Sequence, residues 1–229
     1  MLINNLVKVS IVTLALSCYV SAMDKWYIGA SMGKSDFHFS LDRDLTINQP
    51  AFFFIESRKD SSNMDKKSFN CGFFAGYNYL IKQTPLFIGF EIGAQNYSLE
   101  ATQEERTFPP FVNYRTKIRA NNSLNGIFKI GIFIKDLMIY GKAGIARTKW
   151  TISFIDNNNE IGGSFSSQKF IKHTSLFGFG IDYILNSNWS IGMDCNMAHY
   201  PNLKLTHPIG EFKVSPSVGT TTFRLSYLF

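Results

Sequence analysis

The sequence predicts an all-β fold, an eight-stranded antiparallel up-and-down transmembrane β-barrel, and three observations lead to it. Apolar residues alternate with small or polar ones in repeated segments, short and long links join these segments in turn, and the charged residues inside the segments fall on one face. The composition agrees with this fold class. The 229 residues are 45% hydrophobic and 15% aromatic, with 22 Phe and 10 Tyr, and aromatic side chains favour strands over helices.

Residues 1–22 have the features of a cleaved signal peptide. Lys8 supplies a positive charge, Val9–Val20 an apolar run, and Val20-Ser21-Ala22 a small-residue cleavage site. The alternative is a membrane anchor, but this apolar run is shorter than the roughly 18 residues that such an anchor needs. We therefore expect residues 1–22 to be removed and residues 23–229 to form a single barrel domain.

Three cysteines are present, and none of them predicts a disulfide. Ala15-Leu16-Ser17-Cys18 resembles a lipoprotein cleavage box, so lipidation of Cys18 is an alternative to simple cleavage after Ala22. Cys71 and Cys195 are far apart in the sequence, whereas exported proteins that depend on disulfides carry more cysteines at closer spacing. These two residues are expected to be free thiols.

The first four predicted strands place apolar side chains at every second position. They run through Trp26–Met32, Phe69–Tyr79, Leu86–Ala94 and Leu124–Ile134. In the second of them, the intervening positions are small or polar, as at Gly72 and Asn78. A period of two residues is the side-chain period of a strand.

The last four predicted strands repeat the pattern. They contain Ile139–Ile145, Phe177–Leu185, Trp189–Met197 and the C-terminal stretch Ser217–Phe229. Counting back from Phe229, the positions Tyr227, Leu225 and Phe223 share one face. The intervening Arg224 and Ser226 share the other.

The links between these strands alternate in length. Ile81–Pro85, Lys135-Asp136 and Asn186–Asn188 are as short as hairpin turns. The others are long and polar: Ser40–Lys67, Ser98–Ala120, Ile155–Lys172 and Pro201–Pro216. Short turns at one end and four long loops at the other are typical of barrels in the outer membrane of Gram-negative bacteria, where the long loops are extracellular.

The charged residues decide which face is the interior. A soluble barrel of the lipocalin type also fits eight alternating strands, but its apolar face points inward. Here all the charges within the strands lie on the small and polar face, namely Glu91, Lys129, Lys142, Asp182, Asp194 and Arg224. Three acids and three bases can pair in a narrow lumen while the apolar face contacts lipid.

Several segments carry a resemblance to a known family. They are Trp26–Ala30, Phe128–Gly131, Tyr140–Gly144, Phe179–Tyr183 and Phe223–Phe229. With them, the chain resembles the small eight-stranded surface antigens of the OmpA-like and opacity (Opa-like) family. The resemblance implies an outer-membrane location and raises adhesion to a host-cell surface or matrix as a function. Because the sequence ends with the barrel, tethering to the cell wall is not expected.

The C-terminal strand also resembles the signal that the barrel-assembly machinery reads in Gram-negative outer-membrane proteins. Its outward residues Phe223, Leu225, Tyr227 and Phe229 carry that resemblance. The resemblance implies that this machinery is a partner of the chain during assembly.

The six lumen charges allow two interpretations. They could form a gate or an ion path, or they could be a packed salt-bridge network of the kind that fills a narrow barrel. The size of an eight-stranded barrel favours the network. Glu91 and Lys129 lie on consecutive strands and are the first pair to test.

Basic residues at the upper strand ends are candidates for lipid contact. Arg147 and Lys149 continue the outward parity of Ile139–Ile145, so they are expected near the outer headgroups, where lipopolysaccharide phosphates could pair with them. The alternative is that the strand has already left the membrane there and both cations are solvated.

Two aromatic clusters in the long links are candidate anchors for a protein partner. They consist of Phe52, Phe53 and Phe54 in the first link, and of Phe108 and Phe111 in the second. The alternative is that they fold over the barrel mouth or extend a strand, which their β-propensity favours.

Enzyme and nucleic-acid functions find less support. His173-Thr174-Ser175 resembles the H-x-S step of the outer-membrane lipid A deacylases, but no acid follows on the same face to complete a triad. The histidines show no metal-like spacing, and neither a metal nor a cofactor is expected. The net charge of +6 is spread too evenly over the links for a nucleic-acid surface.

We therefore expect a non-enzymatic, monomeric surface protein that has a structural role and can adhere through its extracellular loops. A small diffusion pore is the first alternative, and a lipid A-modifying enzyme is the second. The sequence does not identify the partner of the loops.

Overall fold

The computed structural model describes residues 25–48, 55–107, 112–156, 165–207 and 210–229. The predicted signal peptide, Cys18 and the aromatic residues Phe52, Phe53, Phe54, Phe108 and Phe111 lie outside these ranges. Nearly all described residues are in strands. No helix among them is long and apolar enough to cross a membrane.

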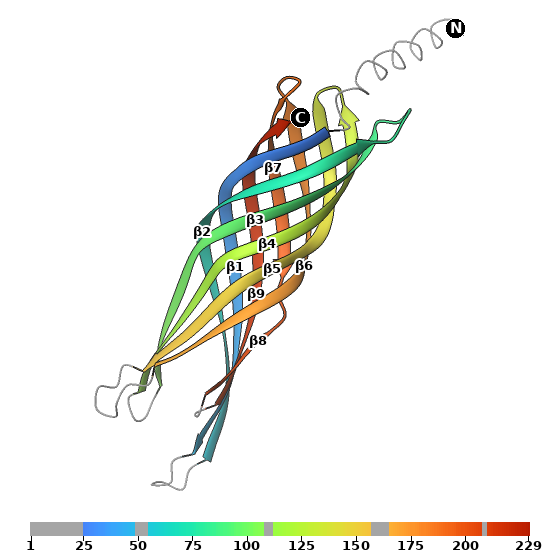
Figure 1. The fold of residues 1–229 in the computed structure, drawn as a ribbon. Coiled ribbons are helices and arrows are strands. Elements are labelled where there is room, and N and C mark those ends of the chain that lie inside the picture. The colour runs from blue at the N-terminus through green and yellow to red at the C-terminus, as the bar shows by residue number, and fades with distance from the viewer. Residues whose placement is uncertain (1–24, 49–54, 108–111, 157–164, 208–209) are drawn as a thin grey trace, which may run out of the picture.

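The strands form a closed antiparallel barrel, which confirms the predicted fold class (Figure 1). In chain order they are β1 (Lys25–Asn48), β2 (Ile55–Leu80), β3 (Leu86–Thr107), β4 (Val112–Ile134), β5 (Leu137–Asp156), β6 (Phe165–Ile184), β7 (Trp189–His199), β8 (Leu203–His207) and β9 (Gly210–Leu228). Strands β1–β7 pair in sequence, β7 pairs with β9, and β9 pairs with β1 to close the barrel. The short strand β8 pairs with β9 beyond the end of β7.

The strands alternate as predicted over the part of the barrel that faces lipid. Apolar side chains such as Phe73, Phe90 and Phe179 are exposed on the outer wall, while Glu91 and Arg224 are buried inside. This polarity is that of a membrane barrel, in which lipid replaces water around the apolar side chains. The two cysteines within the described ranges are free thiols; Cys71 lies on the outer wall, and Cys195 is half-buried.

The strands are longer than the sequence pattern predicted. The segments Ser40–Lys67 and Ser98–Ala120 were expected to be mainly loops, yet β1 pairs with β2 up to Asn48 and Ile55, and β3 pairs with β4 up to Thr107 and Val112. The long links are therefore mostly ribbons that rise above the barrel.

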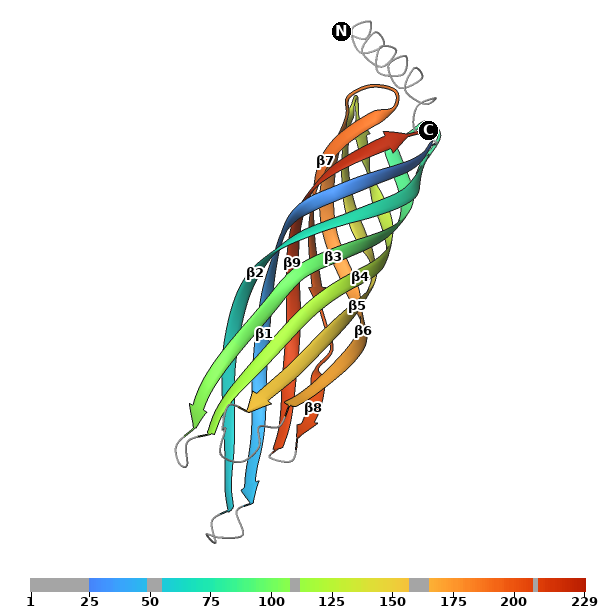
Figure 2. The same cartoon turned by 60° about the vertical axis from the view of Figure 1, so that its left-hand side comes forward.

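Beyond the lipid-facing region, at the end opposite the short turns, which is the lower end in Figure 1, the barrel divides into two sheets. The pairing of β2 with β3 ends at Asn70 and Tyr97, and the pairing of β6 with β7 ends at Leu176 and Ala198. Figure 1 shows β3–β6 leaving the barrel side by side, apart from β1, β2 and β9, and Figure 2 shows the same ribbons after a 60° turn. We call this part the head; sheet I contains β8, β9, β1 and β2, and sheet II contains β3, β4, β5 and β6.

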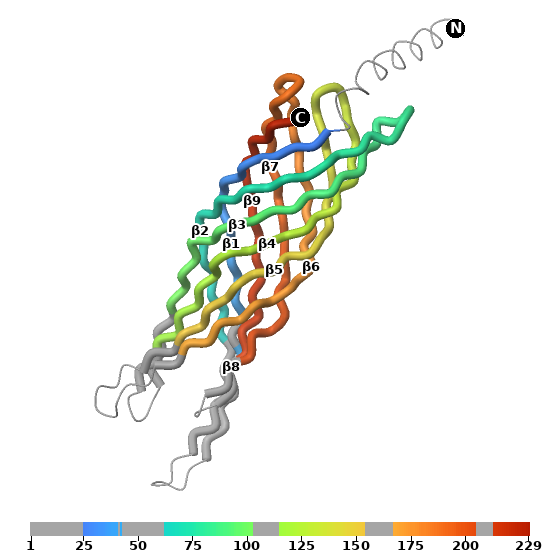
Figure 3. Tube along the Cα trace, in the orientation of Figure 1, coloured from blue at the N-terminus to red at the C-terminus, as the bar shows by residue number. Residues whose placement is uncertain are grey.

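A local feature lies beside each opening. On one side, the register of β3 against β4 shifts between Asn96 and Leu99, and such a bulge bends a strand away from its neighbour. On the other side, Pro201 separates β7 from β8, and proline cannot donate a backbone hydrogen bond to a neighbouring strand. Figure 3 follows the Cα trace through both regions.

Candidate functional site

The interior of the barrel is filled by side chains in layers. At the end that carries the short turns, Phe87, Phe133, Met138 and Tyr140 pack with Leu80, and Tyr27, Phe74 and Leu228 form a neighbouring cluster. Ile184 contacts both clusters. These residues close the lumen at its periplasmic end.

The six charged residues predicted to face the lumen lie together in the next layer. Glu91 binds two cations: its Oε2 atom is 2.5 Å from Lys129 Nζ and 2.5 Å from Arg224 Nη2. Asp194 accepts a bond of 2.5 Å from Lys142 Nζ and another from Arg224 Nη1. The Arg224 guanidinium therefore joins both carboxylates.

Asp182 completes the layer at a longer distance. Its Oδ1 atom is 3.9 Å from Arg224 Nε, and its Oδ2 atom accepts a 3.2 Å bond from the Tyr140 hydroxyl. All six charged side chains are almost fully buried. Three carboxylates balance three cations, so the layer carries no net charge and each charge has a partner that offsets the cost of its burial.

Three aromatic residues support this layer, and the sequence analysis did not single them out. Tyr27 donates a 2.9 Å bond to Glu91 Oε2, and Tyr140 donates a 2.7 Å bond to Asp194 Oδ1. The Arg224 guanidinium carbon lies 3.8 Å from the centroid of the Phe74 ring, a cation–π contact. The signal was available, because all three share the inward parity of Glu91 and Arg224 on their strands.

Above the charges the lumen remains packed. Ile127, Ala146 and Leu176 form a small apolar cluster, and the Thr148 hydroxyl then bonds Ser123 at 2.8 Å and Tyr200 at 2.7 Å. A cavity of about 20 Å³ lies beside Arg224 and Asn125, enough space for roughly one water molecule. Side chains thus fill successive layers of the described part of the lumen.

The head has an apolar core of its own between sheets I and II. Trp150 of sheet II, only 1% exposed, contacts two aromatic rings of sheet I, at centroid distances of 6.2 Å to Phe37 and 6.1 Å to Phe39. It also contacts Tyr200, between β7 and β8, at 5.2 Å. The other buried members of this core are Tyr97, Leu99, Ala101, Ile118, Ala120, Ile152, Ala198, Leu203, Val214 and Val218. In the head the apolar side chains thus point inward, as in a soluble β-sandwich.

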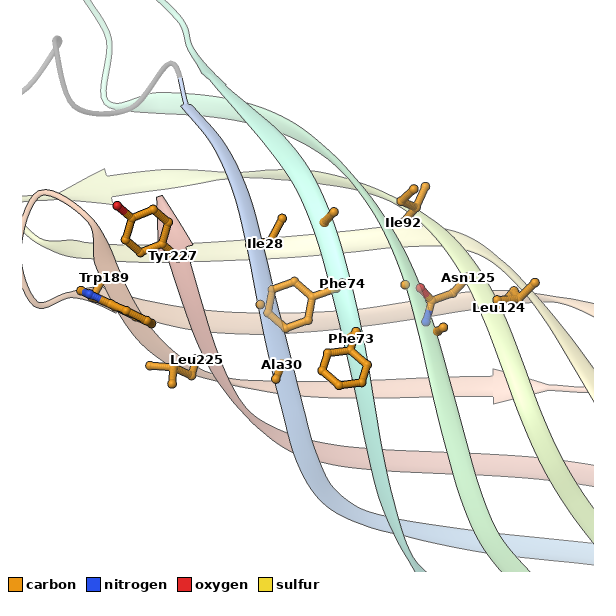
Figure 4. A pocket seen from close by; sticks show the side chains of 14 residues that line it. Ile28, Ala30, Phe73, Phe74, Ile92, Leu124, Asn125, Trp189, Leu225 and Tyr227 are labelled. Carbon is orange, nitrogen blue, oxygen red and sulfur yellow. The ribbon is translucent and has the colours of Figure 1, made fainter. Parts of the chain in front are cut away.

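A groove of about 850 Å³ crosses the outer wall over β7, β9, β1, β2, β3 and β4 (Figure 4). Small side chains, including Ala30, Ala75 and Ala94, line it together with larger ones such as Ile92 and Leu124. Because these outward side chains belong to the lipid-facing wall, the groove faces the hydrocarbon chains of the membrane.

The remaining predicted site residues lie on the outer wall. Arg147 and Lys149 are exposed on β5, with Arg147 opposite His173 on β6. Ser175 is exposed on the same wall opposite Ile145. Phe223, Leu225 and Phe229 are exposed, Tyr227 is half-exposed, and the Tyr227 ring lies 5.2 Å from that of Phe229 and 5.1 Å from that of Trp189.

The described residues contain no group of three or more His, Cys, Asp or Glu side chains that could hold a metal ion. Neither Asp182 nor Asp194 can serve as the acid of the His173 and Ser175 pair, since both are buried in the lumen. The described geometry therefore assembles a charge layer and a head, and no catalytic triad among these residues.

Comparison with known proteins agrees with the barrel architecture. The chain is 22% identical over 210 residues to outer membrane protein P5 of Haemophilus influenzae; the match covers 89% of this chain and 53% of P5, so the chain spans about half the length of that relative. OprG of Pseudomonas aeruginosa superposes with a TM-score of 0.53 at 12% identity, covering 91% of this chain and 97% of OprG. Ail, the attachment invasion locus protein of Yersinia pestis, gives a TM-score of 0.40 at 14% identity, covering 89% and 98% of the two chains.

A family model extends this agreement to almost the whole chain. The model of the outer membrane protein beta-barrel domain matches residues 9–227. Together with the outward apolar wall and the buried charges, this match places the protein in the outer membrane of a Gram-negative bacterium. The chain belongs to the outer membrane protein beta-barrel domain family.

Proposed function

We propose that the protein is a non-enzymatic surface protein whose barrel anchors the head above the outer membrane, where the head contacts a host-cell surface or matrix. The observation that carries this proposal is the apolar core around Trp150 between sheets I and II. A head with its own core presents an ordered surface at a distance from the lipid. A barrel that served only to span the membrane would not need such a core.

A binding assay on intact cells tests this function. Cells that display the protein should bind host cells or immobilised matrix better than cells with an empty vector. Ser40 and Asn63 are opposite each other in the β1–β2 ladder, so a two-residue turn that joins them shortens the ribbon without changing its register. This shortened protein should reach the surface and lose most of the added binding. Equal binding by the displaying and empty cells would reject adhesion.

The pore alternative finds less support in the interior of the barrel. The aromatic clusters at the periplasmic end, the charge layer and the head core lie one above another. A diffusion pore needs a continuous aqueous path, and each of these layers opposes one. We therefore place the charge layer among the structural elements of the barrel.

The lipid A deacylase alternative also finds less support. His173 and Ser175 face outward near the rim, but catalysis of that kind needs a third group that orients the base. If expression of the wild-type protein changed lipid A acylation and Ser175→Ala abolished the change, the protein would be an enzyme. An unchanged lipid A profile is the expected result.

Two further partners follow from the outer wall. We assign Arg147 and Lys149 to contacts with lipopolysaccharide phosphates, because both are exposed just above the outward apolar residues of β5. We assign the C-terminal aromatic residues to recognition by the barrel-assembly machinery. The closed lipid-facing wall leaves no strand edge there for a second copy, which supports a monomer.

A further inference from the structure

The opening between β6 and β8 leaves one edge of sheet II without a strand partner. Strand β6 continues to Phe165 and pairs with β5 along its whole length, but its pairing with β7 ends at Leu176. Strand β8 pairs with β9. Within the described ranges, no strand pairs with the free edge of β6 from Phe165 to Thr174.

The lower end of this opening is closed by a side chain. The Thr174 hydroxyl donates a hydrogen bond to the carbonyl of His199, just above the last backbone pair between β6 and β7. Beyond Thr174, the edge runs for about nine residues, roughly 30 Å at the rise of an extended strand. Free backbone donors and acceptors along such an edge are a template for an added strand.

The charged side chains that the structure describes beside this edge are basic. Lys169 is exposed on β6, Lys204 is exposed on β8, and Arg147 and Lys149 are exposed on β5. None of the side chains at 147–153 on β5, at 167–175 on β6, or at 203–204 on β8 is acidic. The potential at the opening therefore favours an acidic partner.

Lys172 adds a specific recognition group. Its parity on β6 points it toward the interior of the head, next to the half-buried Phe170, and the opening leaves it half-exposed. No carboxylate among the described residues pairs with its amine. An inward lysine at an open edge can bind a carboxylate that an incoming strand presents on the same face.

The opposite opening, between β2 and β3, is less selective. Its β2 edge carries Asp65, Lys66 and Lys67, and Asp65 already pairs with His38. On β3, Glu100 pairs with Lys117 and Arg119. Mixed and internally paired charges do not favour a partner of either sign.

We propose that the β6 edge from Phe165 to His173 binds an extended acidic peptide segment of a partner protein, which joins sheet II as an additional strand. This inference rests on the proposed adhesive function and names the chemistry of its partner. A second copy of the same edge is a poor occupant, because two such strands would bring Lys169 and Lys172 beside the same like charges.

Hydrogen exchange on the full chain in detergent micelles tests this proposal. The probe is a nine-residue peptide of alternating Glu and Val, and the control peptide carries two prolines in place of two valines, so that it cannot form a strand. Binding should slow amide exchange in 167–173 at least tenfold and leave 178–184, already paired on both sides, unchanged. The proline peptide should have no effect.

Charge reversal gives the matched comparison. Lys169→Glu with Lys172→Glu should weaken binding of the Glu-Val peptide at least tenfold. Lys66→Glu with Lys67→Glu makes the same charge change at the opposite edge and should leave binding within twofold of the wild type. Both variants should keep the heat-modifiable gel mobility of a folded barrel, which separates a lost site from a lost fold.

Four results would overturn the proposal. The first is that the peptide does not slow amide exchange in 167–173, and the second is that it slows exchange at the β2 or β3 edge instead. The third is slowed exchange that appears without peptide and increases with protein concentration. The fourth is equal binding of a heparin oligosaccharide and the peptide, with no slowing of exchange. The last two would identify a second copy and a general polyanion contact. If displaying cells bind host cells while any of these results holds, this inference fails and the proposed function stands.

Discussion

Arg224 of β9 reaches across the lumen to Glu91 of β3 and binds both of its carboxylate oxygens. The Nη2–Oε2 distance is 2.5 Å and the Nη1–Oε1 distance is 3.1 Å. The same guanidinium also pairs with Asp194 of β7. One side chain therefore connects three strands that are not all neighbours in the sheet, and the barrel interior depends on it more than on any single lysine of the layer.

Replacing Arg224 with Ala should destabilise the barrel strongly. Glu91 would keep Lys129, and Asp194 would keep Lys142, but both would lose their shared partner in a buried layer. Removing one member of a buried ion pair typically costs about 3–5 kcal/mol, so the urea midpoint of the protein in lipid vesicles should fall accordingly.

Two comparisons make this result specific to the charge layer. Lys149 is exposed on the outer wall of β5, so Lys149→Ala should change the unfolding free energy by less than about 0.5 kcal/mol. The double variant Glu91→Gln and Arg224→Met restores charge balance and should recover part of the loss. An unchanged midpoint for Arg224→Ala would show that the layer is not an energetic centre of the barrel.

Trp150→Ala should loosen the head and leave the membrane part folded. A buried Trp replaced with Ala typically costs about 3–5 kcal/mol, and the lost contacts with Phe37, Phe39 and Tyr200 all belong to the head. Limited trypsin digestion on intact cells should cleave the head of the variant faster than that of the wild type. The membrane fragment should stay protected, and digestion of the whole chain at one rate would contradict a separate head core.

The sequence predicts the membrane part well because the bilayer imposes a strict rule. An outward charge is costly there, so the parity of Glu91 and Arg224 alone identifies the lumen. The head obeys the opposite rule, in which outward residues are polar and inward ones apolar. Leu99 and Val214 keep the inward parity of their strands, but the polar residues around them make the segments Ser98–Ala120 and Pro201–Pro216 appear to be loops. Continuing the alternation of each membrane-spanning segment into the link that follows it would have predicted this core. The openings beside β3 and β7 depend on which strands pair, so the alternation does not predict them.

The wild-type protein should show no stepwise conductance in planar bilayers. The aromatic clusters at the periplasmic end and the charge layer fill the described part of the lumen, and the cavity beside Arg224 is about 20 Å³. Refolded protein should give flat current traces at the same protein-to-lipid ratio at which a general porin gives steps. Reproducible steps that disappear on denaturation would restore the pore alternative.

Glu100 in the head should titrate below an ordinary glutamate. Hydrogen bonds from Lys117 and then Arg119 lower the pKa of its exposed carboxyl, because the cations favour the charged form. The stability that this carboxyl contributes to the folded protein is fully present above its pKa in the unfolded chain. It is lost as the pH falls through its lower pKa in the folded protein. Carbon-detected NMR titration should show a low midpoint for the Glu100 carboxyl. This midpoint should rise in the double variant that combines Lys117→Met and Arg119→Met. A midpoint equal in both proteins would contradict the ion pairs.

Brominated lipids should distinguish the three tryptophans of the chain by their depth. Trp26 and Trp189 are 66% and 41% exposed on the outer wall near the short turns, whereas Trp150 is 1% exposed inside the head. Bromine on the acyl chains quenches fluorescence only from indoles that contact it. A Trp26→Phe and Trp189→Phe variant, in which Trp150 alone emits, should therefore be almost insensitive to brominated lipid. A Trp150→Phe variant should be quenched strongly. Strong quenching of Trp150 would place the head within the bilayer, and with it the edge of β6 would be inaccessible to any peptide partner.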